Sequence, residues 1–91
     1  MATRSIYEGP ELARHAANHV ALSPVSMLKR TTRVHPERTA VIHGSLIRTW
    51  AETEIRCRRL ASALKKRGIG KGETVALLAP NIPEVLECHF A

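Results

Sequence analysis

Residues 74–91 read TVALLAPNIPEVLECHFA, and this stretch decides the fold class. It begins with an unbroken apolar run, Val75 to Ala79, which is typical of a parallel strand covered on both faces. A proline-containing turn follows, and Pro83 suits the first position of a helix. Strand, turn and helix are the units of α/β domains. We therefore expect an α/β fold with a buried strand over the apolar run and the start of a helix at Pro83.

A buried parallel strand needs a partner strand on each edge, and the preceding residues offer few candidates. In α/β domains, ligands bind at the carboxyl ends of several strands that lie far apart in the sequence. We therefore expect these 91 residues to be the front of a longer enzyme, truncated at the C-terminus. Such a piece carries scaffold and no catalytic groups.

The helix expected from Trp50 to about Arg67 is the best-signalled element. Thr49 and Glu52 have the spacing of a capping box, and Gly68 supplies a left-handed stop. At about 100° per residue, one stripe of the helix is apolar and the opposite side is basic. The expected inward positions are Trp50, Thr53, Cys57, Leu60, Ala61 and Leu64. Outside this stripe we expect Glu52–Arg56 and Glu54–Arg58 ion pairs, and an exposed Ile55.

Upstream of this helix, the sequence predicts a first helix and a β-hairpin. Ser23 is a good N-cap and Pro24 a good first residue for a helix that ends at Val34, before His35-Pro36. Its expected inward residues are Val25, Met27, Leu28 and Thr32. Two β-rich runs, 39–43 and 46–49, flank a glycine turn and form the hairpin. Residues 1–22 lack periodicity, so we divide the chain into an N-terminal extension, 1–22, and a partial domain, 23–91.

The excess of positive charge is a feature of proteins that bind nucleic acids. Fourteen Lys and Arg against eight acidic residues give a net charge of +6. With only three aromatic residues, however, the chain has no stacking platform for bases, and we expect no nucleic-acid partner. A small basic module that binds an acidic partner without catalysis stays as an alternative.

The sequence also bears on compartment. No apolar run is long enough to span a membrane. Arg4 and Arg14 are offset by Glu8 and Glu11, which argues against an acid-poor transit peptide. Two cysteines without a CxxC pair fit buried free thiols in a reducing compartment, so we expect a cytoplasmic protein.

None of the residue patterns that suggest chemistry is complete. His15 and His19 have a spacing that can bind zinc from one helix face, but a third ligand is missing. Neither Cys57 nor Cys88 has a visible base, and Glu84 and Glu87 resemble ordinary first-turn helix residues. The glycine-spaced loop 68–72 follows a helix and feeds a strand, the reverse of a phosphate-binding loop. We assign no catalytic, cofactor-binding or metal-binding residue.

The order of motifs resembles the start of the adenylate-forming acyl-CoA synthetases, the AMP-binding enzymes. The resemblance runs from LSPVSMLKRTTRVHPERTAVIHG (22–44) through TWAE (49–52) to RCRRLASALKKRGIGKGETVALLAPNIPEVLECHFA (56–91). It implies an N-terminal piece of the family's large domain, closest in look to short- and medium-chain fatty acyl-CoA ligases. Other adenylating enzymes, such as aryl-CoA ligases and peptide-synthetase adenylation domains, stay open as alternatives.

The resemblance also implies a two-step reaction. A small carboxylic acid attacks the α-phosphate of ATP, with Mg²⁺ neutralising phosphate charge, and the thiol of coenzyme A then displaces AMP from the acyl-adenylate. The family's phosphate loop, acyl pocket and catalytic lysine lie beyond the region covered here. The resemblance therefore implies that this chain alone binds none of the cofactors and is inactive, and it leaves the oligomeric state open.

The basic composition gives a first testable prediction. We expect the chain to bind duplex DNA only weakly, through phosphate charge, and to release it as salt rises to physiological strength, because such contacts exchange with counterions. Fluorescence anisotropy with a labelled duplex, titrated at low and physiological salt, measures this. Tight binding that survives physiological salt would support the basic binding module instead.

Overall fold

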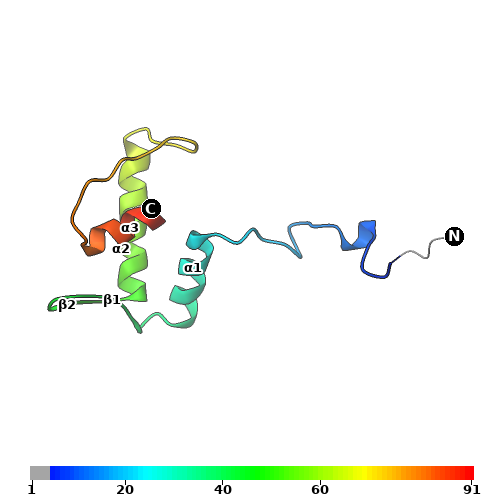
Figure 1. Cartoon of the computed structure of the whole chain (residues 1–91), viewed down its shortest axis with the longest axis horizontal. Coiled ribbons are helices and arrows are strands. Elements are labelled where there is room, and N and C mark those ends of the chain that lie inside the picture. The colour runs from blue at the N-terminus through cyan, green and yellow to red at the C-terminus, as the bar shows by residue number, and fades with distance from the viewer. Residues whose placement is uncertain (1–4) are drawn as a thin grey trace.

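The computed structural model describes residues 5–91, so the first four residues of the expected extension, including Arg4, lie outside the described part. Figure 1 shows the N-terminal region running away from a cluster of helices, with α2 at the centre of that cluster. The elements in chain order are a short 3-10 helix η1 (Pro10–Leu12), α1 (Pro24–Val34), β1 (Thr39–His43), β2 (Leu46–Thr49), α2 (Trp50–Lys66) and α3 (Pro83–Phe90). The predicted α/β class is confirmed, and the helix and hairpin bounds agree with those expected.

The two N-terminal caps form as the sequence predicts. At α1, the Ser23 hydroxyl accepts a hydrogen bond from the amide of Ser26 at 3.1 Å, and the Ser26 hydroxyl accepts one from the amide of Ser23 at 3.1 Å. At α2, Thr49 and Glu52 satisfy each other's amides in the same way, at 3.2 and 3.3 Å. These reciprocal bonds pair backbone donors that a helix start leaves open, and so they fix where each helix begins.

The hairpin is antiparallel, and its turn places Gly44 at φ +60°, a region that favours glycine. It is joined tightly to α2, because the amides of Trp50 and Ala51 donate to the carbonyls of Arg38 and Pro36, each at 3.0 Å. At its other end α2 stops at Gly68, whose φ of +84° is the predicted left-handed stop. The hairpin and α2 therefore form one continuous unit.

The core is small and centres on the contact between α1 and α2. Leu28 on α1 and Cys57 on α2 are buried, and Thr53 is 1% exposed with its hydroxyl donating to the Thr49 carbonyl at 2.8 Å. Ile55 is exposed, as predicted. The prediction was wrong for Val25 and Met27, which are 39% and 48% exposed. They lie at the edge of a helix whose main packing partners in the described chain are α2 and α3.

The predicted buried strand at 74–79 is wrong for this structure. The segment is neither a strand nor buried: all residues from Gly70 to Asn81 are exposed, and Leu78 is fully so. The two-stranded sheet of the described chain pairs β1 only with β2, so no neighbouring strand offers hydrogen bonds to this segment. An apolar run becomes a strand only where partners satisfy its backbone groups. The apolar composition of 74–79 predicts a strand, but the described chain has no neighbouring strand that pairs with it.

The capping box of α2 gives a prediction about stability. Replacing Thr49 by Ala removes the hydroxyl that accepts from the Glu52 amide, and we expect the free energy of unfolding to fall by about 1 kcal/mol. Thr49→Ser keeps the hydroxyl and serves as the matched control. Urea unfolding followed by far-UV circular dichroism measures both. Equal losses in the two variants would show that the Thr49 methyl group, and not the cap, carries the effect.

Candidate functional site

The described residues contain one buried ionic cluster, built around the carboxylate of Glu87. Arg48 Nη1 donates to Glu87 Oε1 at 2.9 Å, and Arg56 Nε donates to the same oxygen at 2.5 Å. The Glu87 side chain is only 6% exposed, whereas that of Arg56 is 39% exposed. Glu84 lies 3.8 Å from Arg56 at the more open edge of the cluster. We call Arg48, Arg56 and Glu87 the ionic cluster.

The ionic cluster corrects two expectations drawn from the sequence. Glu87 is not an ordinary surface residue of α3, and Arg56 does not pair with Glu52 on the outer face of α2. It turns instead toward a carboxylate 31 residues away. The second expected pair, Glu54–Arg58, is confirmed at 2.7 Å. A local charge pattern predicts helical neighbours well, but it carries no information about a partner on another element.

The electrostatics of the ionic cluster indicate a structural role. The hydrogen bond to Glu87 raises the pKa of Arg56 above its ordinary value, against a smaller opposing effect of burial. The charge of Arg56 therefore stabilises the folded chain below the ordinary pKa of arginine, and this contribution is lost only as the pH rises through the raised pKa. Arg56 keeps its charge at physiological pH.

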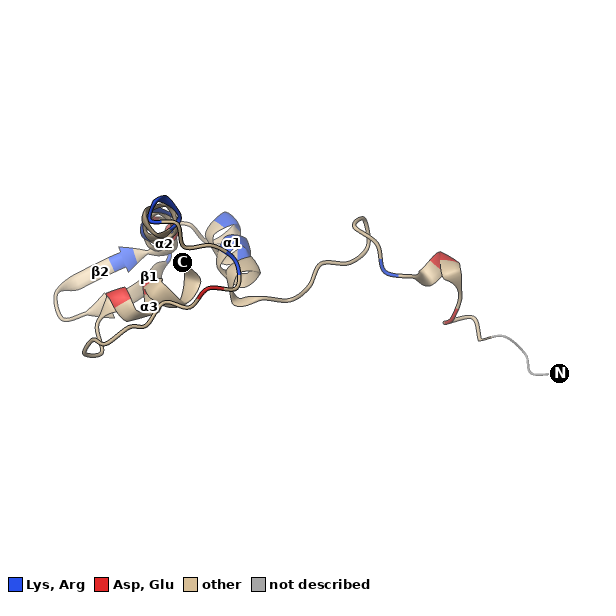
Figure 2. Ribbon diagram, turned by 90° about the horizontal axis from the view of Figure 1, so that it is seen from above, with Lys and Arg blue, Asp and Glu red and all other residues tan. Residues whose placement is uncertain are grey.

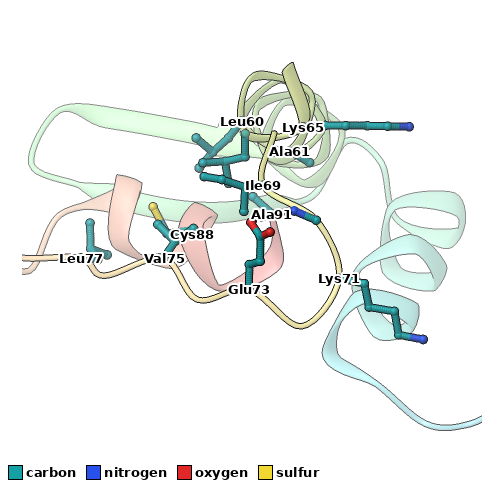
Figure 3. A pocket seen from close by; sticks show the side chains of 12 residues that line it. Leu60, Ala61, Lys65, Ile69, Lys71, Glu73, Val75, Leu77, Cys88 and Ala91 are labelled. Atoms are coloured by element: carbon teal, nitrogen blue, oxygen red, sulfur yellow. Dashed lines mark hydrogen bonds between the residues drawn. The ribbon is translucent and has the colours of Figure 1, made fainter. Parts of the chain in front are cut away.

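A hollow of about 560 Å³ lies between α2, the 69–77 segment and α3 (Figure 3). Its walls are mainly apolar, and its charged residues are at the rim. Figure 3 shows the side chains of Lys65 and Lys71 extending away from the hollow, while Glu73 curls back so that its carboxylate accepts from the Gly70 amide at 3.3 Å. The main apolar wall residues are Leu60, Leu64, Ile69, Val75 and Leu77. This wall can cover an apolar surface, but it holds no set of groups for acid–base or nucleophilic chemistry.

The two cysteines differ, against the expectation that both are buried. Cys57 is buried in the core, but Cys88 is exposed and lines the hollow. Cys88 lies on the side of α3 that faces the uncovered 69–77 segment, and nothing in the described chain closes over it. Burial raises the pKa of the Cys57 thiol above 9.0. Since the unfolded chain then ionises first, stability falls as pH rises above 9.0.

Neither of the other candidate sites considered from the sequence is assembled. His15 and His19 lie at a turn and not on a helix face, and the His15 ring accepts from the Ala17 amide at 3.2 Å. Among residues 5–91, no three His, Cys, Asp or Glu side chains gather as metal ligands do. The 68–72 loop links α2 to the extended 74–79 segment, and it opens no helix that could hold a phosphate. None of the helices in the described part is long and apolar enough to cross a bilayer.

Comparison with known proteins identifies the family to which this structure belongs. Residues 28–91 match the family model described as "AMP-binding enzyme". The chain belongs to this family. The match begins within α1 and runs through the hairpin, α2, the hollow and α3 to Ala91. The ionic cluster and the hollow are therefore features of an AMP-binding enzyme domain, and the resemblance seen in the sequence is confirmed.

Three relatives show the closeness of the match. The acetate–CoA ligase CCL3 of Humulus lupulus is 53% identical over 81 residues, and the peroxisomal acetate/butyrate–CoA ligase AAE7 of Arabidopsis thaliana is 55% identical over 80 residues. The peroxisomal benzoate–CoA ligase of Arabidopsis thaliana is 43% identical over 81 residues. These alignments cover 88–89% of this chain but 14% of each relative, so the chain spans about a seventh of their length. No solved structure matches the chain.

The ionic cluster gives a prediction with a built-in control. Glu87→Gln leaves two guanidinium groups without their buried counter-charge, and we expect the free energy of unfolding to fall by about 2 kcal/mol, moderated by the water that reaches Arg56. Glu84→Gln removes the same charge from the same helix at a half-exposed site. There we expect the free energy of unfolding to fall by about 0.5 kcal/mol or less. Urea unfolding compares the two. Equal effects would show that only the net charge of α3 matters.

The unequal burial of the cysteines gives a second prediction. Under native conditions near neutral pH, a thiol reagent such as Ellman's reagent should modify Cys88 quickly and Cys57 slowly, because reagent reaches only an exposed sulfur. In denaturant both should react fast. Mass spectrometry of partly modified chain assigns the first site. Initial modification at Cys57 would contradict the packing of α1 on α2.

Proposed function

We propose that this chain belongs to an ATP-dependent acid–CoA ligase that converts a small carboxylic acid to its CoA thioester through an acyl-adenylate. The observation that carries the proposal is the AMP-binding family match over residues 28–91, joined to 53–55% identity with ligases named for acetate and butyrate. Every group needed for the reaction in this scheme, namely ATP, Mg²⁺ and coenzyme A, is small and diffusible. The partners we propose are therefore small molecules.

The described residues form no site that fits ATP, and this limits what the chain contributes to the reaction. A triphosphate needs a cradle of backbone amides or a set of cationic donors around its oxygens. The guanidinium groups of Arg48 and Arg56 are already bound to Glu87, and the glycine loop opens no helix. We propose that residues 1–22 are an extension, that 23–91 begin the AMP-binding domain, and that nucleotide chemistry belongs to other parts of the full-length protein. By this proposal the 91-residue chain alone is inactive.

For the acid, we propose a short-chain aliphatic carboxylate. The relatives named for acetate and for acetate and butyrate are 53–55% identical to this chain. Those named for benzoate and trans-cinnamate, and a second one named for butyrate, are 42–43% identical. This difference favours an aliphatic acid, and it makes an aromatic acid the runner-up. The proposal of an aliphatic substrate includes longer fatty acids, and with them a role in fatty acid metabolism.

For the compartment, the cytoplasm stays our prediction. Several relatives carry the word peroxisomal in their names, including the acetate/butyrate ligase, so the alternative compartment is well defined. Imaging of the full-length protein fused at its N-terminus to a fluorescent protein, beside a peroxisomal marker, distinguishes the two.

The activity is tested on the full-length protein with ATP, Mg²⁺ and coenzyme A. We expect pyrophosphate release and CoA-thioester formation with acetate or butyrate, and much less with benzoate. Omitting coenzyme A should still allow hydroxylamine to trap an activated acyl group, because the adenylate forms first. The 91-residue chain, assayed at the same concentration, should show no turnover. Pyrophosphate release without any thioester would point to another kind of adenylating enzyme, and preference for benzoate would favour the aryl-CoA runner-up.

A further inference from the structure

The positive charge of the chain is concentrated in α2 and in the loop that follows it. Residues 55–72 contain no acidic residue, but they contain seven of the fourteen Lys and Arg residues. Two of the seven have acidic partners, since Arg56 is paired with Glu87 and Arg58 with Glu54. The other five take part in none of the ion pairs of residues 5–91.

Four of these cations share one face of α2. At about 100° per residue they fall within an arc of about 120°, with Ser62 near its middle, and this arc lies opposite the buried Thr53. All four are exposed, and the exposed Ile55 lies in the same arc one turn earlier. We call this set the basic stripe: Arg58, Arg59, Lys65 and Lys66.

A structural role explains only part of the basic stripe. Lys65 and Lys66 complement the negative end of the helix dipole, but this effect is confined to the last turn. Arg58 and Arg59 lie about two turns before the end of α2, and Arg59 also lacks an acidic partner on the helix. The repeated placement of cations on this face therefore extends beyond what the helix itself requires.

The basic stripe belongs at the surface of the full-length protein. Burying several cations against other protein is costly unless each receives a counter-charge, and residues 55–72 supply none. The opposite face of α2 contains the buried Thr53 and Cys57 and packs against α1 and α3. Further parts of the domain can extend that packing while the basic stripe stays in contact with solvent.

The partner that the basic stripe fits is an anionic lipid surface. A cluster of about four to eight Lys and Arg residues on an amphipathic helix is typical of binding to anionic headgroups. Protein interfaces usually depend on aromatic anchors and disfavour lysine, whereas residues 55–72 contain no aromatic residue and two of the four stripe residues are lysines. We propose that the protein binds to anionic membrane surfaces through the basic stripe of α2. The contact is peripheral and needs no helix that spans the bilayer.

The experiment measures co-sedimentation of the full-length protein with vesicles in the absence of substrates, so its result does not depend on the proposed ligase activity. One set of vesicles is phosphatidylcholine, and the other is equal parts phosphatidylcholine and phosphatidylserine. We expect binding to the anionic set only, and less of it as salt rises from low to physiological strength, because salt screens the charges. Equal binding to both sets, or no binding to the anionic set at low salt, would overturn the proposal. Tighter binding to a labelled DNA duplex in the same buffer would overturn it in favour of a nucleic-acid partner.

Paired variants separate the basic stripe from the net charge. Replacing both Lys65 and Lys66 by Gln should lower the binding constant for anionic vesicles about tenfold or more, since each cation near such a surface contributes about fivefold. Replacing both by Arg keeps the charge and should preserve binding. Replacing Arg14 and Arg38 by Gln removes the same charge from exposed residues outside α2 and should also preserve binding.

Far-UV circular dichroism confirms that each variant keeps its helices. Equal losses in the two Gln variants would show that only net charge acts, and the assignment to the basic stripe would then be wrong. Unchanged binding after Lys65 and Lys66 are replaced by Gln would contradict it as well.

Discussion

The carboxylate of Glu87 is the single group on which the arrangement of this chain most depends. It is almost fully buried, and it accepts hydrogen bonds from Arg48 on β2 and Arg56 on α2. A buried charge is costly unless it is paired, so the three elements are held in one relative position that keeps the pairs intact. The apolar core of Leu28 and Cys57 is too small to fix α3 by itself. The ion pairs of this one oxygen link α3 to both β2 and α2.

The ionic cluster also limits what the described residues can bind. Two guanidinium groups that could in principle bind an anionic substrate are paired with Glu87. Figure 2 shows other Lys and Arg residues on α1 and α2 and in the N-terminal region. The hollow beside α2 is apolar, with its lysines turned outward. Two surfaces are left uncovered in the described chain, namely the hollow and the 74–79 segment, and both lie within the residues that match the AMP-binding family. The chain spans about a seventh of the length of its relatives.

Features set by residues close together in the sequence could be predicted, whereas contacts between distant residues could not. Capping boxes at Ser23 and Thr49, the glycine stop at Gly68 and the hairpin turn at Gly44 were all predictable, because each depends on residues within about one helical turn of the other. The ionic cluster was not predictable, because Arg48 and Arg56 meet Glu87 across 39 and 31 residues, and their nearest charged neighbours suggested other pairs. Periodicity gave one further hint that sequence reasoning did not use: Glu87 shares a helical face with Pro83, and that face is the buried one.

By itself, the sequence determined the α/β class, the bounds of two helices and a hairpin, the start of a third helix, and the family, since motif order and local signals need no tertiary contact. Only the tertiary structure decided the fate of the apolar run TVALLA at 74–79. Its composition is that of a buried strand, but a strand exists only where other backbone groups pair with it. With β1 and β2 paired to each other, the run stays extended, exposed and open at its edge. Burial of a strand depends on its partners as much as on its own sequence. For this reason the apolar run that predicts the fold class makes no backbone hydrogen bond in the described chain.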